Sequence, residues 1–347
     1  MNRRRSILTV VQAVALLCLV SVPASCQRAR ATAPDSAGGL VRVAEISLPG
    51  PAVRFDYQTV DTTANRLYVA HMNAGTLLVF DTNTRKVIAN LPGFPSVHGV
   101  VAVPSVGKVF ASATGEHRVV IVSAATLKSV ARVGPIGYPD GLAFAPDARR
   151  VFVSDESRAG RELVIDAVGD SVLGGIDLGG EAGNTIWDPV SRRILVAVQT
   201  RAEIAAIDAS TARIVARYPV TGSKRPHGLV IDPVRKLLFA ADEAKSELFV
   251  IQLPSMRVLS HHSVGDDPDV LAVDPELGRL YVACESGVVD VFQVEDGRVV
   301  SLGRLAIPHA HTVAVDPVTH LVYLPIQQLG GRPVLEIYRP AEVAGER

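Results

Sequence analysis

Three histidines and three aspartates stand at equivalent positions of a repeating sequence, and imidazole and carboxylate together can bind a divalent transition metal. The repeat is marked by Asp-Pro or a variant of it at positions 61, 103, 145, 188, 232, 274 and 316, which are 42, 42, 43, 44, 42 and 42 residues apart. Five residues before these markers stand Asp56, His98, Asp140, Gly183, His227, Asp269 and His311. If the units form a closed circle, these side chains converge on its axis. The three histidines then predict a site for one divalent transition metal, and the three aspartates predict contacts with a small polar ligand.

A structural role explains the same residues equally well. Most of them stand in the context Pro-His-Gly, Pro-Asp-Gly or a close variant. Such sequences are typical of a tight turn in which the side chain bonds neighbouring backbone groups. In the fourth unit the position is Gly183, and we expect the adjacent Asn184 to turn inward and contact the ligand in its place.

A second set of polar residues occurs in the loops that join the second and third strands of each unit. We expect these loops to surround the mouth of the central channel, although exposed loops are polar in most proteins. His71, Asp155 and Asp242 each lie 15 residues after the axial residue of their own unit. We therefore expect these three at one depth and include them among the ligand-binding residues.

The elements that must position these side chains are β-strands. Within a unit the apolar residues alternate or form short β-rich runs, as at 66–70, 76–80 and 86–89, and turn-forming residues separate the runs. Four short strands with their turns account for the length of one unit. Repeats of this kind bury their apolar faces by stacking on one another. The sequence therefore predicts an all-β fold, a seven-bladed β-propeller of four-stranded antiparallel blades.

Closure of the ring is predicted from the two ends of the repeat region. Residues 40–50 resemble the end of a blade, such as residues 86–93, yet no blade precedes them. The seventh unit stops at residues 338–340 after three strands. We therefore predict that residues 41–48 form the outer strand of the last blade, which leaves no open edge. The propeller then spans residues 40–340, followed by a tail at 341–347.

The N-terminus predicts export. Three arginines at 3–5 precede an apolar run at 7–20 and small residues up to Cys26, the pattern of a signal peptide over residues 1–26. Residues 22–26 are similar to a bacterial lipoprotein box, with Pro23 where Leu is usual, so Cys26 is a candidate lipid anchor. Cleavage near Ser25 or after Ala31 is the alternative, and residues 27–39 read as a flexible linker. We expect a location in the periplasm or cell envelope, with or without a membrane anchor.

Charge and cysteine content exclude several classes of function. Lys plus Arg and Asp plus Glu each total 35, so no basic surface favours nucleic acid. The mature chain would contain only Cys284 and, depending on processing, Cys26, which gives no internal disulfide framework. The sequence contains no serine-hydrolase elbow, phosphate loop, haem-attachment motif or zinc-protease helix.

The repeat resembles that of the YVTN-type seven-bladed propeller family. The segment 134–155 carries the resemblance, together with Arg-Leu-Tyr-Val-Ala at 66–70 and again at 279–283. The resemblance covers about residues 40–340 and implies the propeller fold. For activity it implies little, because the family includes many exported bacterial proteins of unassigned role and relatives that bind ligands or metals.

Three functions follow from these observations. The first is an exported, non-enzymatic propeller that binds a small ligand, a metal ion or a protein partner at the top of its channel. The second is a metal-dependent hydrolase or lyase, similar to the lactonase-type and streptogramin-lyase propellers. Against it, lactonase-like relatives also ligate through Glu, and the seven axial positions contain none. The third is a scaffold for protein assembly at the cell envelope.

Overall fold

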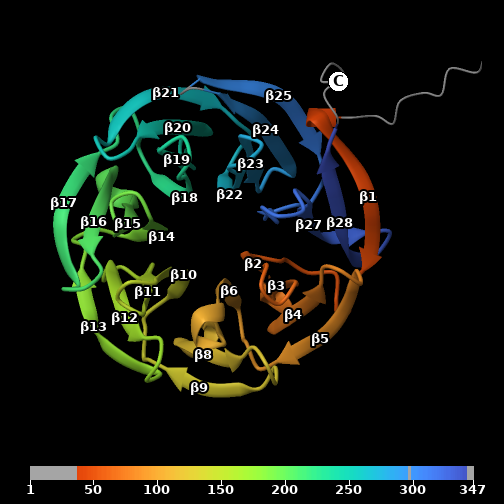
Figure 1. The fold of residues 1–347 in the computed structure, drawn as a ribbon, viewed down its shortest axis with the longest axis horizontal. Coiled ribbons are helices and arrows are strands. Elements are labelled where there is room, and N and C mark those ends of the chain that lie inside the picture. The colour runs from red at the N-terminus through yellow and green to blue at the C-terminus, as the bar shows by residue number, and fades with distance from the viewer. Residues whose placement is uncertain (1–36, 296–297, 342–347) are drawn as a thin grey trace, which may run out of the picture. The chain divides into compact units, whose positions relative to one another are not determined.

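The computed structural model describes residues 37–295 and 298–341, which form seven four-stranded antiparallel sheets arranged in a ring (Figure 1). This confirms the predicted seven-bladed β-propeller. The signal region with Cys26, linker residues 27–36 and tail residues 342–347 lie outside the described residues. Short 3-10 turns accompany the strands: η1 (Ala37–Gly39), η2 (Met72–Ala74), η3 (Pro104–Val106), η4 (Thr114–Glu116) and η5 (Gln199–Arg201). Within the described ranges, no helix is long and apolar enough to cross a membrane.

Each blade runs from an inner strand near the axis to an outer strand at the rim (Figure 1). Blade 1 consists of β2 (Gln58–Asp61), β3 (Arg66–His71), β4 (Thr76–Asp81) and β5 (Lys86–Pro92), and blade 2 of β6 (Val97–Val103), β7 (Lys108–Ala113), β8 (Arg118–Ser123) and β9 (Ser129–Val133). Blade 3 consists of β10 (Pro139–Ala145), β11 (Arg150–Asp155), β12 (Arg161–Asp166) and β13 (Ser171–Asp177), and blade 4 of β14 (Ala182–Asp188), β15 (Arg193–Val198), β16 (Glu203–Asp208) and β17 (Arg213–Pro219).

The remaining three blades complete the circle. Blade 5 consists of β18 (Pro226–Asp232), β19 (Leu237–Asp242), β20 (Glu247–Gln252) and β21 (Arg257–Ser263), and blade 6 of β22 (Pro268–Asp274), β23 (Arg279–Cys284), β24 (Val288–Glu295) and β25 (Arg298–Ala306). Blade 7 consists of β26 (Ala314–Val315), β27 (Val322–Leu329), β28 (Arg332–Pro340) and β1 (Leu40–Ser47).

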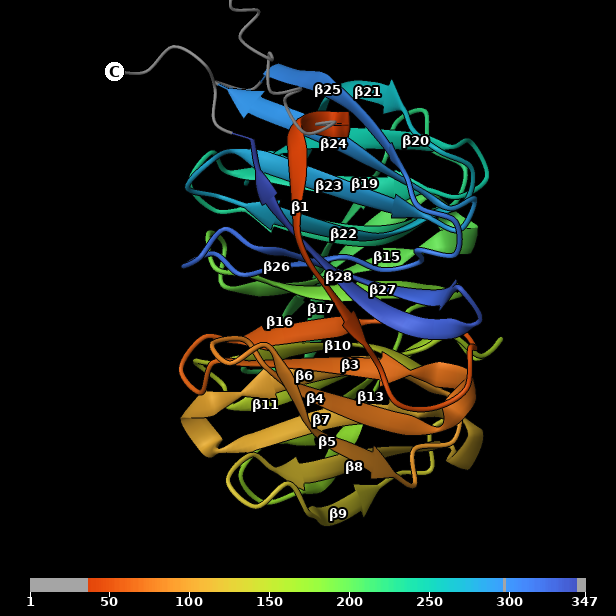
Figure 2. The same ribbon diagram turned by 90° about the vertical axis from the view of Figure 1, so that its right-hand side faces the viewer.

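The last blade takes its outer strand from the start of the repeat region, as the sequence predicts. Strand β1 pairs antiparallel with β28, in a register that runs from Leu40 opposite Pro340 to Ser47 opposite Val334. Figure 2 shows the two strands side by side. The connector at 48–57 then leads from the rim of blade 7 to the inner strand of blade 1. The two ends of the ring are therefore joined by a strand ladder.

Packing between blades explains the strand pattern. The second and third strands of a blade are covered on both faces by their neighbours, so β3 is buried from Leu67 to His71, whereas the outer β5 alternates between exposed and half-buried residues. Large side chains such as Tyr68, Phe110 and Phe239 are fully buried in the clusters between blades. Burial of one such side chain contributes roughly 1.5–3 kcal/mol. A rigid ring results, and it fixes the positions of the inner strands.

Candidate functional site at the centre of the ring

A β-bulge lies at or next to the axial residue in five of the seven blades. The register of the inner strand shifts between Val97 and Val100, and at the matching places in β10, β14, β18 and β22. A bulge bends the strand locally and redirects a side chain. Blade 7 differs, because its inner strand keeps only Ala314–Val315 and His309 adopts a left-handed φ of 66°. His311 is therefore presented from an irregular segment.

The glycine after two axial histidines has a steric cause. A Cβ atom at Gly99 would lie 2.1 Å from the carbonyl oxygen of Asp140, and one at Gly228 would lie 1.8 Å from that of Asp269. Both distances are far below van der Waals contact, so only glycine lets the next blade approach this closely. In the fourth blade, a Cβ at Gly183 would lie 3.1 Å from Nδ1 of His227. Gly183 thus leaves room for the imidazole of the next blade.

Seven ionisable side chains from different blades converge at this level. They form three groups whose possible ligand atoms lie within 4.8 Å of one another: Asp56, Asp269 and His311; Asp140, Glu156 and His227; and His227, Glu243 and Asp269. We call these seven residues the acidic centre. It contains five carboxylates and two imidazoles. It therefore offers the donor atoms of a site for a divalent cation.

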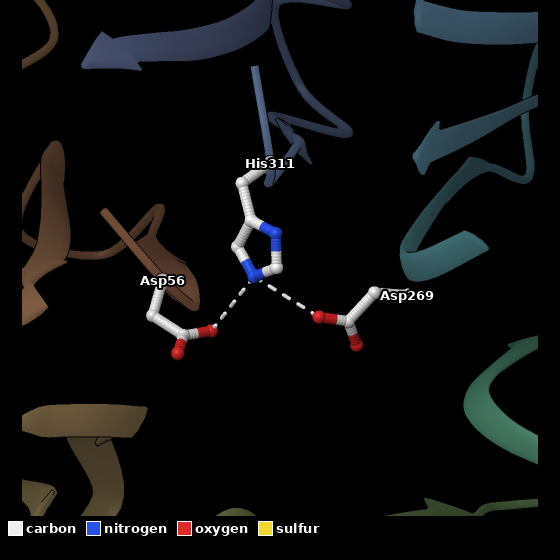
Figure 3. A group of neighbouring side chains, drawn as sticks. All are labelled: Asp56, Asp269 and His311. Atoms are coloured by element: carbon white, nitrogen blue, oxygen red, sulfur yellow. Dashed lines mark ion pairs between the residues drawn. The ribbon is translucent and has the colours of Figure 1, made fainter. Parts of the chain in front are cut away.

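The first group surrounds one nitrogen of His311 (Figure 3). Nε2 of His311 lies 3.5 Å from Oδ1 of Asp56 and 3.0 Å from Oδ2 of Asp269. Asp56 is 1% exposed and Asp269 is 7% exposed, and Oδ1 of Asp56 has no hydrogen-bond partner. Buried polar atoms without a partner are costly and rare. This group therefore combines side chains that can bind a cation with a carboxylate oxygen that has no hydrogen-bond partner.

His227 occupies the middle of the other two groups. Its Nε2 lies 3.1 Å from Oδ1 of Asp269, and its Nδ1 lies 3.4 Å from Glu156 and 3.6 Å from Glu243. Nδ1 is buried and has no hydrogen-bond partner. Asp269 consequently faces His227 with one oxygen and His311 with the other. The two halves of the acidic centre meet at this carboxylate.

The two histidines of the centre are more readily protonated than a free imidazole. Burial disfavours an imidazolium, but the adjacent carboxylates of Asp269 and Asp56 outweigh it and raise the pKa of His311 to about 10. His227 behaves in the same way: burial opposes its charge, yet Asp269, Glu156 and Glu243 raise its pKa well above the usual value. Burial also opposes ionisation of Asp269, but the two imidazoles hold the pKa of this carboxyl well below its usual range.

The pKa values of two other carboxyls of the centre are raised. Burial, with a further contribution from the charge of Asp56, raises the pKa of Asp140 to about 6. Burial and the charge of Asp140 raise the pKa of Glu156 to about 9. Glu156 therefore retains a proton at neutral pH. The centre holds more carboxylate than its own cations can balance.

The glutamates are the residues that the sequence interpretation missed. The seven axial positions contain no Glu, as the sequence shows, but Glu156 and Glu243 from other positions belong to the acidic centre, and Glu285 lies 3.6 Å from Nδ1 of His311. Each stands 16 residues after the axial residue of its blade, one position beyond the residues chosen from sequence. The equivalent positions in all seven blades are Met72, Thr114, Glu156, Gln199, Glu243, Glu285 and Gln327. Their regular spacing was the available signal.

Neighbouring side chains hold these glutamates in place. Gln199 donates to Glu156 over 3.1 Å, Arg225 donates to Glu243 over 3.3 Å, and Arg54 lies 3.0 Å from Glu285. Arg54 also lies 2.8 Å from Nε2 of His311, and its buried Nε has no partner. A pocket of about 110 Å³ opens beside this arginine, lined by Glu285, His311 and Gln327 among others. Of the first group, His311 lines this pocket.

His98 does not join the other two histidines. Its Nδ1 donates to the carbonyl oxygen of Ser96 over 2.7 Å, and its Nε2 accepts from the Tyr138 hydroxyl over 3.0 Å. Both nitrogens are therefore used within the protein, as the structural interpretation of this position expects. Among the described residues, none of the three groups contains two imidazoles. The predicted cluster of His98, His227 and His311 is thus replaced by mixed groups of imidazole and carboxylate.

The residues predicted at the loop positions support the centre from outside. Asp155 accepts from the backbone N–H of Gly137 and Tyr138, and Asp242 accepts from those of Lys224 and Arg225. His71 is fully buried and stacks on Phe55, with ring centroids 4.1 Å apart.

Each of these three anchors the segment that precedes the inner strand of its own blade. Asn184 accepts from the backbone N–H of Thr185 over 2.8 Å. Their role in ligand binding stays a prediction.

The comparisons with known proteins show the fold. No protein-family model matches the chain, and no curated protein matches its sequence, so membership of the YVTN-type family stays a prediction. A hydrazine synthase structure from Kuenenia stuttgartiensis aligns with a TM-score of 0.71 at 14% identity, covering 88% of this chain and 98% of that one. A virginiamycin B lyase structure from Staphylococcus aureus aligns with a TM-score of 0.70 at 11% identity, covering 86% and 98%. Similarity at this identity concerns the seven-bladed fold alone.

Proposed function

We propose that the protein binds a divalent transition-metal ion at the centre of the ring, through Asp56, Asp269 and His311, together with a small polar ligand. The observation that carries the proposal is the buried Oδ1 of Asp56, which has no hydrogen-bond partner. The carboxylates of Asp56 and Asp269 flank an imidazole nitrogen at 3.5 Å and 3.0 Å. A ligand set of imidazole and carboxylate suits Mn, Fe, Co or Zn. Mg and Ca prefer a set that consists of oxygen atoms alone.

The small ligand would reach the ion from the pocket beside His311. Arg54 and Gln327 line this pocket, and Arg54 offers an N–H that no protein group uses. A carbonyl or carboxylate oxygen of the ligand would accept from this donor. The donor set therefore favours a ligand that carries such an oxygen.

Metal content and a binding isotherm test this function. Protein treated with a chelator and then dialysed is titrated with Mn²⁺ and Zn²⁺ by calorimetry, and bound metal is measured after gel filtration. Asp56→Asn should weaken Mn²⁺ binding by at least about 100-fold. Loss of a residue that only hydrogen-bonds to a metal ligand already costs about 10–100-fold in affinity, and loss of the ligand itself costs more. Asp61→Asn, in the same blade, is the matched control and should bind normally. Absence of heat and of retained metal in the wild-type protein would refute the proposal.

A metal-dependent hydrolase or lyase is the second candidate, and the position of Glu156 favours it. This side chain carries a proton at neutral pH, because burial raises its pKa to about 9, and it lies 3.4 Å from Nδ1 of His227. Glu156 can thus donate a proton while His227 holds or relays one. A bound divalent ion would polarise a carbonyl group in a substrate.

Activity assays separate the two candidates. A panel of lactones and esters is screened with chelator-treated and Mn²⁺-loaded protein, alongside Glu156→Gln. Catalysis predicts turnover that requires metal and falls by roughly 100-fold or more in Glu156→Gln, the size expected for loss of a general acid. Metal binding without turnover on any substrate would exclude the hydrolase or lyase and support the binding function.

We also propose that the protein acts outside the cytoplasm, on the basis of residues 1–26. Fractionation of expressing cells, with and without these residues, tests this. Recovery of both forms in the cytoplasm would exclude export, and labelling with a palmitate analogue that depends on Cys26 would support the lipid anchor.

A further inference from the structure

We propose that the acidic centre binds two divalent cations, bridged by the carboxylate of Asp269. This inference rests on the proposed metal-binding function and extends it to a second ion on the His227 side. The first ion lies with Asp56 and His311, and the second with His227 and Glu243. Each half supplies one imidazole and one further carboxylate, and Asp269 belongs to both groups.

The geometry of Asp269 supports a bridge. Its Oδ1 lies 3.1 Å from Nε2 of His227, and its Oδ2 lies 3.0 Å from Nε2 of His311. One carboxylate thus presents a separate oxygen to each imidazole. In two-metal sites the ions lie roughly 3.5–4 Å apart, a spacing that a single carboxylate can span. Asp269 is 7% exposed, so the bridge is shielded from bulk water.

Unsatisfied atoms occur on both sides of Asp269. Oδ1 of Asp56 is unpartnered in the first half, and Nδ1 of His227 and Oδ1 of Asp140 are unpartnered in the second. Asp56, His227 and Asp140 are each less than a tenth exposed. A single ion beside His311 would leave the atoms of the second half without a partner. The second half therefore contains unsatisfied atoms of its own, separate from those of the first.

Stoichiometry and magnetic coupling test the inference. Chelator-treated protein is titrated with Mn²⁺, bound metal is measured after gel filtration, and electron paramagnetic resonance spectra are recorded at each ratio. We expect two ions per chain, with the hyperfine pattern of isolated Mn²⁺ at low ratio and a broadened, exchange-coupled signal at saturation. One ion per chain would overturn the second site and leave the proposed function intact. No bound ion would overturn both, and two uncoupled ions would overturn the bridge.

Variants assign the ions to the two halves. His311→Ala should retain one Mn²⁺ on the His227 side, and Glu243→Gln should retain one on the His311 side. Asp269→Asn should abolish the coupled signal and weaken both ions by more than about tenfold. Asp274→Asn, on the same strand, is the matched control and should keep both ions and their coupling. Retention of the coupled pair in Asp269→Asn would contradict the bridging role.

Discussion

The aspartates at the two ends of the inner strands differ in their hydrogen bonding. At one end the turn aspartates, Asp61, Asp188, Asp232, Asp274 and Asp316, accept hydrogen bonds from the backbone two and three residues further on. Five residues earlier on β22, and at the equivalent place in blade 1, Asp269 and Asp56 are also buried, but neither accepts a backbone hydrogen bond within the part of the chain that the structure describes: Asp269 faces two imidazoles, and Oδ1 of Asp56 has no partner.

The difference separates a structural carboxylate from a functional one. A turn aspartate finds its partners in its own sequence, so the turn is complete within one blade. In the acidic centre, Asp56 and Asp269 face side chains from other blades, some of them also acidic. Their partners are protons and, as proposed, cations from solution. Satisfied local hydrogen bonding therefore predicts a role in stability, and its absence within a cluster of possible ligands predicts a role in binding.

The largest effect on stability is expected at the turn end. Asp232→Ala removes a fully buried carboxylate that accepts from the N–H groups of Val234 and Arg235 and pairs with the Arg235 guanidinium at 2.9 Å. We expect the free energy of unfolding in urea to fall by about 3 kcal/mol, because a buried charge loses its partner. Mn²⁺ affinity should be unchanged. A loss of metal binding comparable to that of His311→Ala would break the comparison.

A change of opposite sign is expected in the acidic centre. Glu156→Gln replaces a carboxyl whose ionised form is disfavoured by burial and by Asp140. In chelator-treated protein at neutral pH, we expect the free energy of unfolding to rise by about 1–2 kcal/mol, as when other binding-site residues are neutralised. Glu285→Gln is the control, since this side chain is 41% exposed and pairs with Arg54. Destabilisation by Glu156→Gln would show that the carboxyl serves the fold.

Dependence on pH should follow from the same carboxyls. The pKa of Asp140 is raised to about 6 and that of Glu156 to about 9, chiefly by burial, so the folded protein holds protons that the unfolded chain releases. Their contribution to stability is complete below about pH 4 and is lost as pH rises through these values. The raised pKa values of His227 and His311 act in the same direction. The lowered pKa of Asp269 matters only at more acidic pH.

Chelator-treated protein should therefore become less stable between about pH 5 and about pH 9, by at least about 1 kcal/mol. Urea unfolding at several pH values measures this. Glu156→Gln should flatten the upper part of the profile. A stability that rises over this range would contradict the assignment of protons to the centre.

The smallest effect is expected at a buried carboxyl that lies alone. Glu162, on β12, is fully buried with no partner for either oxygen, and burial raises its pKa well above the usual range. It belongs to none of the three groups. Glu162→Gln should raise the free energy of unfolding at neutral pH by about 1 kcal/mol and leave Mn²⁺ binding intact. Loss of metal binding in this variant would show that a single buried carboxyl can mark the site.

Much of the fold can be predicted from the sequence because each unit repeats its turn and its strand pattern. The marker positions give the blades, and residues 40–50 give the closing strand. The axial residues follow from the same register, which is why Asp56, Asp269 and His311 are found in advance. Residues at the ends of the second strands are harder to assign, because successive side chains point in opposite directions and a one-residue error reverses the assignment. Asp155 therefore anchors a loop, whereas Glu156 faces the centre.

Other parts of the site depend on contacts that no single position reveals. The spacing of His98 alone suggests a metal ligand. In the structure, its two ring nitrogens instead bond the backbone of Ser96 and the hydroxyl of Tyr138 from the next blade. Arg54 reaches His311 from the connector between the last and first blades, 257 residues away in sequence.

The strand that closes the ring also determines when the centre can exist during folding. Asp56 lies in the connector that follows β1, and His311 precedes the strands of the sheet that β1 completes, so the two sides of the first group lie on either side of this seam. Until β1 has paired with β28, the ring is open and Asp56 is not held beside His311. Metal capture would then be the last event of biogenesis, and the ion would come from whichever compartment the completed chain occupies at that moment.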